Sequence, residues 1–201
     1  MILNLTVLRY SYKIFLYFII LCCVTLSPLS CGNSRDKNNS YIDTVANLSG
    51  KRIVFPESLR LVSKLNKHNN TDSNIIAPNY KIIAYYGKGG CTSCRIKLKK
   101  WAQYIESLYP DNDTIVTRLI IIIPSEEERK IKYLAKCDNF NYDIMVDTDD
   151  KFRNTNNISS NPHLNSYLLN NNDEIIAVGN PINNKKIGNL YRKLITEGTD
   201  K

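Results

Sequence analysis

Apolar and polar positions along this chain alternate between strand-like runs and helix-like repeats. Short apolar runs predict strands at 52–55, 81–86, 115–123 and 142–146, and two more, 167–169 and 174–178, flank an Asn-rich turn and predict a hairpin. Ser125 and the three glutamates after it predict a helix start, with the helix running to about Cys137, and residues 185–195 predict a closing amphipathic helix. This alternation predicts an α/β fold with helices on both faces of a sheet.

The first thirty residues differ from the rest of the chain. Arg9 and Lys13 precede an uncharged apolar run from Ile14 to Leu26, and a small polar segment with a proline, Ser27–Ser30, follows. This order is typical of a secretory signal peptide. The apolar run of 13 residues is shorter than the roughly 20 that a membrane-spanning helix needs.

The segment Leu29-Ser30-Cys31-Gly32 resembles a bacterial lipobox, which implies cleavage after Ser30 and a lipid on Cys31. The polar residues that follow favour a flexible tether. We therefore expect a lipoprotein signal peptide at 1–30, a tether at 31–50 and a domain at 51–201, held at a membrane on the periplasmic side of the cell envelope. A soluble secreted protein cleaved elsewhere is the alternative.

Composition narrows the class of protein. The 201 residues suffice for one domain plus extra chain, and 43% hydrophobic with 23% charged residues is typical of a globular protein. Six cysteines are too few for a disulfide scaffold. The net charge of +8 would suit nucleic acid or a membrane surface, but an exported chain rarely meets nucleic acid, so we expect no nucleic-acid partner.

The most informative stretch is a Cys-x-x-Cys pair, Cys91 and Cys94, between a predicted strand and a predicted helix. Gly87, Gly89 and Gly90 precede it. After Cys94, apolar positions three and four residues apart share one helix face: Leu98, Trp101, Ala102, Ile105, Leu108 and Tyr109. This pattern places Cys91 at the helix N-terminus near solvent and Cys94 one turn on, beside the buried face.

That placement suits redox chemistry, because the thiolate is the form of cysteine that attacks disulfides. Unpaired N–H groups at a helix start favour a thiolate, and Lys88 and Arg95 add positive potential. Thiols in such settings have pKa values lowered from about 8.5 to roughly 3.5–7.5. Cys91 would attack a partner disulfide and Cys94 would resolve the mixed disulfide.

Other roles for the pair remain open. A structural disulfide between these positions would close almost no chain. A zinc site would need two more ligands from Cys137, His68 and His163, and copper(I) could be held by two thiolates plus His163. We expect no cofactor and no resident metal, with His163 as the residue that a metal site would need. Cys137 is either a buried small apolar residue or a third redox thiol.

At these residues the chain resembles the thioredoxin fold, in its TlpA-like and peroxiredoxin-like branch. The likeness covers about 51–194 and includes Asp147–Asp150 and the hairpin with its following Gly179-Asn180-Pro181. The segment Cys91–Trp101 is similar to a group of bacterial lipoproteins with a thioredoxin-like domain. The resemblance implies a central mixed sheet with an extra helix and strand inserted at about Ser125–Val146.

The resemblance also implies roles, and two positions depart from the family pattern. Cys91 would be the attacking cysteine and Cys94 the resolving one. Gly90 stands where thioredoxins usually have Trp, and the cis-proline position falls at Leu164, two residues after Pro162.

We therefore expect a membrane-anchored envelope thiol–disulfide oxidoreductase. Its partners would be exported thiol or disulfide proteins and a membrane electron donor. The alternatives are a Sco-like copper(I)-binding module, which would use His163, and a non-catalytic lipoprotein that uses the fold as a scaffold.

Overall fold

The computed structural model describes residues 43–63, 78–89, 91–108, 116–159 and 161–198. The predicted signal peptide, Cys31, most of the tether and His68 lie outside the described residues. The end of the predicted tether needs correction: residues 43–48 form a helix, and Leu48 is buried in the core. No helix in the described ranges is both long enough and apolar enough to cross a membrane.

In the described part of the chain, six strands form one mixed sheet in the order β1-β4-β3-β2-β5-β6. The strands are β1 (Leu59–Ser63), β2 (Tyr80–Tyr85), β3 (Thr117–Pro124), β4 (Asp143–Asp147), β5 (Ser166–Leu169) and β6 (Ile175–Val178). Strands β2, β3 and β4 are parallel. Strand β5 is antiparallel to β2, β6 is antiparallel to β5, and β1 is antiparallel to β4.

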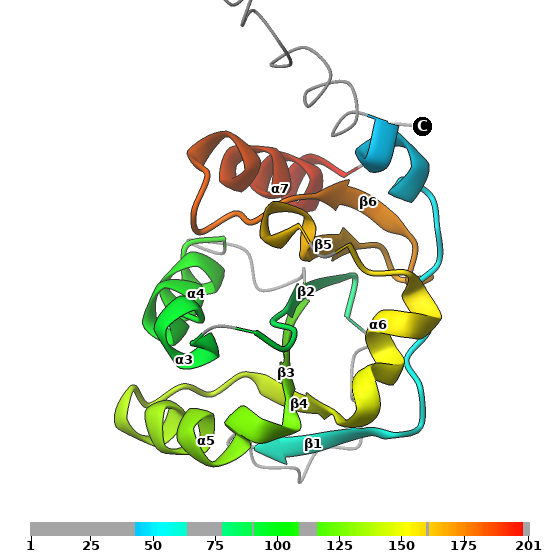
Figure 1. The fold of residues 1–201 in the computed structure, drawn as a ribbon. Coiled ribbons are helices and arrows are strands. Elements are labelled where there is room, and N and C mark those ends of the chain that lie inside the picture. The colour runs from blue at the N-terminus through cyan, green and yellow to red at the C-terminus, as the bar shows by residue number, and fades with distance from the viewer. Residues whose placement is uncertain (1–42, 64–77, 90, 109–115, 160, 199–201) are drawn as a thin grey trace, which may run out of the picture. The chain divides into compact units, whose positions relative to one another are not determined.

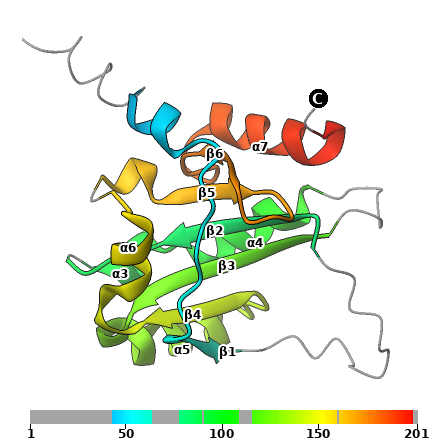
Figure 2. The same ribbon diagram turned by 90° about the vertical axis from the view of Figure 1, so that its right-hand side faces the viewer.

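Helices cover both faces of this sheet (Figure 1). They are α3 (Thr92–Arg95), α4 (Leu98–Glu106), α5 (Glu128–Cys137), α6 (Lys151–Asn156) and α7 (Lys185–Glu197), with 3-10 turns at Ser125–Glu127, Thr148–Asp150 and Pro162–Leu164. Figure 2 shows α6 in front of the sheet, with α4 and α5 behind it.

The core has two layers because successive side chains of a strand point to opposite faces. Ile82 and Ala84 of β2 pack with Trp101 of α4 and Tyr191 of α7 in one layer. The alternate β2 residues pack with Phe152 of α6 and with Leu48 in the other layer. A strand buried on both faces reads as a continuous apolar run, which is why the sequence predicts β2 and β3 so clearly.

The predicted fold class is confirmed. A strand leads into the Cys-x-x-Cys helix, a parallel strand follows, and an antiparallel hairpin and a closing helix complete the arrangement of the thioredoxin fold. The inserted helix and strand are present as α5 and β4, and β4 widens the sheet beyond β3.

The predicted strand at 52–55 was wrong. Arg52 makes only an isolated bridge to Glu174, and Val54 is exposed. Pro56 ends the run too early for a ladder to form, because proline has no N–H to donate. The strand at the β4 edge of the sheet is instead β1, whose short mixture of apolar and polar residues is a weaker pattern.

Candidate functional site

Cys91 and Cys94 are joined by a disulfide, with their Cα atoms 5.3 Å apart. Cys91 is the N-cap of α3, and both cysteines are exposed. The predicted placement of Cys91 near solvent is confirmed, whereas the placement of Cys94 beside the buried face was wrong.

The reason is a break in the predicted helix. α3 ends at Arg95 and α4 begins at Leu98, with Lys97 between them in the left-handed region at φ 46°. Ile96 and Leu98 are 1% and 2% exposed. In a continuous helix, residues two apart cannot face the same core. The break lets both side chains reach the core, and α3 buries Thr92 while Cys94 faces solvent.

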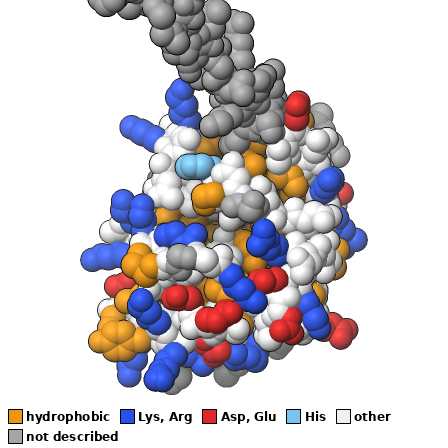
Figure 3. Space-filling model, in the orientation of Figure 1, with side chains coloured by type: hydrophobic (Ala, Val, Ile, Leu, Met, Phe, Trp, Pro, Cys, Tyr) orange, Lys and Arg blue, Asp and Glu red, His pale blue; other side chains and the backbone are white. Residues whose placement is uncertain are grey.

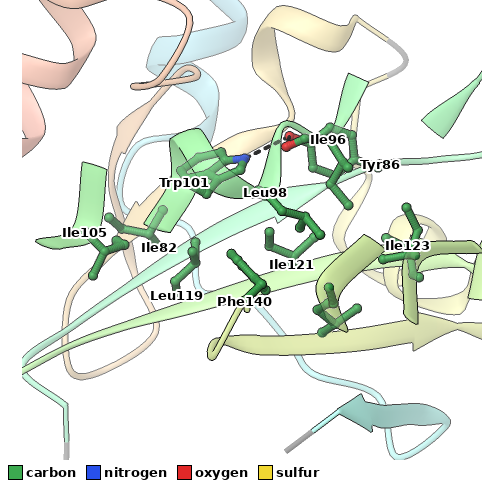
Figure 4. Packing of buried hydrophobic residues seen from close by; sticks show 14 of the residues in the cluster. Ile82, Tyr86, Ile96, Leu98, Trp101, Ile105, Leu119, Ile121, Ile123 and Phe140 are labelled. Atoms are coloured by element: carbon green, nitrogen blue, oxygen red, sulfur yellow. Dashed lines mark hydrogen bonds between the residues drawn. The ribbon is translucent and has the colours of Figure 1, made fainter. Parts of the chain in front are cut away.

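A buried hydrogen-bond network lies at this break. The Tyr86 hydroxyl donates to the carbonyl oxygen of Ile96 at 3.2 Å and accepts from the indole Nε1 of Trp101 at 2.9 Å. Figure 4 shows the Trp101–Tyr86 bond among the apolar side chains of the core. Burial raises the pKa of Tyr86, so its hydroxyl keeps the proton that it donates. The network satisfies a carbonyl at the point where the helix is interrupted.

The cations predicted to support the thiolate are occupied elsewhere. Arg95 donates to the carbonyl oxygen of Gly89 at 2.8 Å. The Lys88 ammonium lies 3.2 Å from Asp150 and 3.8 Å from Glu126, and the hydrogen bond to Asp150 raises the pKa of Lys88. Figure 3 shows basic and acidic side chains intermixed on the face of the molecule that is turned toward the viewer in Figure 1.

A different cation reaches the sulfur. The Nζ of Lys130, on α5, lies 3.8 Å from the Sγ of Cys91, and the Oγ of Ser93 lies 3.2 Å from the same sulfur. Sequence reasoning missed Lys130, which is 39 residues away from Cys91. Several basic residues lie along α5, and nothing in their spacing indicated which would face the cysteines.

Beside Cys94 is a cavity of about 240 Å³ between α3, the start of β5 and the loop after β6. The residues that line it are Tyr85, Tyr86, Cys94, Arg95, Lys97, Pro162, Asn165, Ser166, Asn180 and Asn183. Leu164, where the resemblance placed the cis-proline position, is buried, and Pro162 lines the cavity. The described residues contain no cis peptide bond.

The remaining candidate residues lie apart from the pair or outside the description. His163 is exposed on a 3-10 turn, is absent from the cavity lining, and its backbone N–H donates to the Asn161 side chain at 3.0 Å. No group of three possible metal-binding His, Cys, Asp or Glu side chains occurs among the described residues. Cys137 is exposed, so its interpretation as a buried apolar residue was wrong, and a hydrogen bond to Cys137 raises the pKa of Tyr133.

Comparisons with known proteins find likenesses among solved structures. No family model matches the chain, and no curated protein does. An uncharacterized thioredoxin-like protein from Porphyromonas gingivalis is 21% identical, with 61% of this chain and 79% of that one covered and a TM-score of 0.44. The thioredoxin domain of a thiol-disulfide oxidoreductase from Bacteroides vulgatus is 16% identical, covering 74% and 98%, at a TM-score of 0.48.

A thioredoxin-family thiol:disulfide interchange protein from Chlorobium tepidum is 15% identical, covering 57% of this chain and 80% of that one, with a TM-score of 0.41. The thioredoxin-like assignment of this chain rests on its own strand order and connections.

Proposed function

We propose that this protein is a thiol–disulfide oxidoreductase that works through Cys91 and Cys94. The observation that carries the proposal is the disulfide itself, which joins two exposed cysteines on a single helical turn beside the Lys130 ammonium. Exposed sulfurs can be reached by the sulfur of another protein, and a disulfide in such a place is of the labile, catalytic kind.

A purely structural role explains the pair less well. Stabilisation by a disulfide grows with the length of chain that it closes, and this one has a sequence separation of 3. The surrounding segment is already held by the buried Ile96, Leu98 and Trp101. The bond therefore adds little to the fold.

The reaction follows from the two positions. In the reduced protein the Cys91 thiolate attacks one sulfur of a substrate disulfide. A bond forms between Cys91 Sγ and that sulfur, the substrate S–S bond breaks, and the leaving thiolate takes a proton from water. The Cys94 thiolate then attacks Cys91 Sγ, which releases the second substrate thiol and closes the Cys91–Cys94 disulfide. The substrate gains two electrons and the protein loses two, and the reverse sequence oxidises a substrate dithiol.

The cavity beside Cys94 offers a place for the polypeptide around the reacting sulfur. Amide side chains of Asn165, Asn180 and Asn183 line it, and such groups can hydrogen-bond to backbone N–H and C=O groups. Contacts with the backbone tolerate many side chains, which fits an enzyme that acts on several proteins.

The location and substrates are a further part of the proposal. Its support is the signal-peptide pattern before Cys31 and the lipobox resemblance at that residue. The protein would be lipid-anchored in the cell envelope, act on disulfides of exported proteins and receive electrons from a membrane donor. Palmitate labelling that is lost in Cys31→Ser tests the anchor, and equal labelling of both forms would contradict it.

The redox function is tested by trapping. Full-length Cys94→Ser protein, which can attack but not resolve, should accumulate mixed disulfides with a disulfide substrate such as insulin, seen on non-reducing gels. Cys91→Ser should trap none, and Cys137→Ser should reduce insulin at the wild-type rate. Wild-type protein without insulin reductase activity, together with an empty trap, would overturn the proposal.

A further inference from the structure

We infer that Lys130, on the inserted helix α5, is a catalytic residue of this site: its ammonium group stabilises the thiolate of Cys91 and so makes Cys91 the attacking cysteine. The inference rests on the proposed function, because it concerns the step in which Cys91 attacks. The contact on which it depends is the 3.8 Å approach of Lys130 Nζ to Cys91 Sγ. In the oxidised protein this sulfur is uncharged, and reduction converts the contact into an ion pair.

The position of Lys130 is fixed by the packing of its helix. The adjacent Ile131 is 0% exposed and Ala135 is 1% exposed, and both anchor α5 to the sheet. Lys130 lies on the flank of that buried face, and α5 packs beside α3 (Figure 1). The ammonium is therefore presented to Cys91 by a rigid element.

The other charged side chains near Cys91 contact other groups. From the preceding loop, Lys88 contacts Asp150 and Glu126, and from α3 Arg95 donates to loop carbonyls. On α5 itself, Glu128 is held by Arg60 and Lys132. Among the described residues, no carboxylate lies within ion-pair distance of Lys130, and the ion-paired acidic groups of this region have other cations as partners. Lys130 is therefore a cation that contacts the Cys91 sulfur and that no carboxylate among the described residues neutralises.

A nearby opposite charge favours the ionised form of an acid, so removing Lys130 should raise the pKa of the Cys91 thiol. The group is exposed and screened by water, so we expect a rise of about 0.5–1 unit, which lowers the thiolate fraction below the pKa by roughly three- to tenfold. Because the attacking species is the thiolate, attack at neutral pH slows in the same direction.

The test measures Cys91 alkylation by iodoacetamide against pH in the reduced full-length protein, with peptide mass spectrometry to separate Cys91 from the other cysteines. Lys130→Gln should raise the midpoint of the alkylation–pH curve by about 0.5–1 unit, the same rise that is expected for the Cys91 pKa. Lys130→Arg should leave this midpoint unchanged. Lys132→Gln, on the same helix and paired with Glu128, is the matched control and should leave the midpoint in place. About 1 M salt should raise the wild-type midpoint toward that of Lys130→Gln, because salt screens exposed charges.

A midpoint unchanged in Lys130→Gln, or moved equally by Lys132→Gln, overturns the inference. The salt response of the wild type tests the same contact without any variant: a midpoint that does not rise contradicts the role of Lys130. Failure of the proposed function is seen separately, since an empty Cys94→Ser trap can accompany a clear shift in the midpoint.

Discussion

Helix α3 contains Cys94, has Cys91 as its N-cap and buries only Thr92, whereas α4, which begins at Leu98, buries Leu98, Trp101 and Ile105. The two helices follow the same strand and are separated by two residues. Helix α3 is a single turn that exposes sulfur to solvent, and α4 packs its buried side chains against the sheet. The segment with the cysteines is thus short and exposed, and the helix that follows it is longer and packs into the core.

The residues between the two helices explain how α3 can be exposed while α4 is buried. Lys97 adopts a left-handed conformation, and the Ile96 carbonyl accepts a hydrogen bond from Tyr86. The core contacts of Ile96 and the neighbouring helix α5 therefore hold the segment that contains the two sulfur atoms. Changes to α4 should affect stability, while changes to α3 should affect chemistry.

Trp101→Ala should give the largest loss of stability. It removes a fully buried indole and one partner of the Tyr86 hydroxyl. We expect the free energy of unfolding to fall by about 3–5 kcal/mol. Urea unfolding of the oxidised protein, followed by far-UV circular dichroism, measures this. The exposed neighbour Lys99→Ala should change stability by less than about 0.5 kcal/mol, and an equally small loss for Trp101→Ala would remove the contrast between α3 and α4.

Tyr86→Phe should have the next largest effect. The ring stays in place, but the Ile96 carbonyl and the Trp101 N–H lose their partner in a buried environment. We expect a loss of about 1–3 kcal/mol by denaturant unfolding. Tyr133→Phe, at a residue 68% exposed, is the control and should be close to neutral. A neutral Tyr86→Phe would mean that the break between α3 and α4 needs no support from this hydroxyl.

Lys97→Gly and Lys99→Gly should shift stability in opposite directions. Glycine relieves the left-handed backbone at Lys97, so we expect a gain of about 0.5–1 kcal/mol, reduced by loss of the Lys97–Asn183 hydrogen bond. Inside α4, Lys99→Gly should cost about 0.5–1 kcal/mol. Thermal unfolding measures both. Losses of the same size in both variants would mean that the chain between α3 and α4 is helical in solution.

The last prediction concerns α5, the helix that carries Lys130, and its effect is confined to acid pH. Hydrogen bonds from Arg60 and Lys132 lower the pKa of Glu128 from 4.5 to about 2. A lowered folded-state pKa contributes stability above the ordinary pKa, and that contribution is lost as pH falls from about 4.5 toward 2. Glu128 is partly exposed, so we expect about 0.5–1 kcal/mol. Glu128→Gln should flatten the acid limb of a stability–pH curve, and an unchanged limb would contradict this pairing.

Much of the fold could be predicted because its strands are buried on both faces. The continuous apolar runs of β2 and β3 and the Asn-rich turn of the hairpin are strong local patterns. The edge strand β1 has one neighbour, so its pattern is weaker, and the short β-branched run at 52–55 resembles a strand more closely. Cys91 and Cys94 could be predicted because the Cys-x-x-Cys spacing is itself a local pattern in the sequence.

The rest of the site depends on contacts between residues far apart in the sequence. A helix face counted at regular spacing from Cys94 includes Leu98 and Trp101 but leaves out Ile96, which is buried because the helix breaks at Lys97. Lys130 reaches Cys91 only because α5 packs beside α3. Neither the burial of Ile96 nor the contact between Lys130 and Cys91 corresponds to a local pattern in the sequence.

Whether Cys91 and Cys94 are a working redox pair is decided by the reduction potential of their disulfide, measured in the full-length protein by equilibration with glutathione or dithiothreitol and mass spectrometry of the alkylated peptides. A working pair should titrate as one two-electron couple between about −270 and −120 mV, the range spanned by thioredoxin and DsbA. A potential below about −300 mV, typical of structural disulfides, would contradict the redox function.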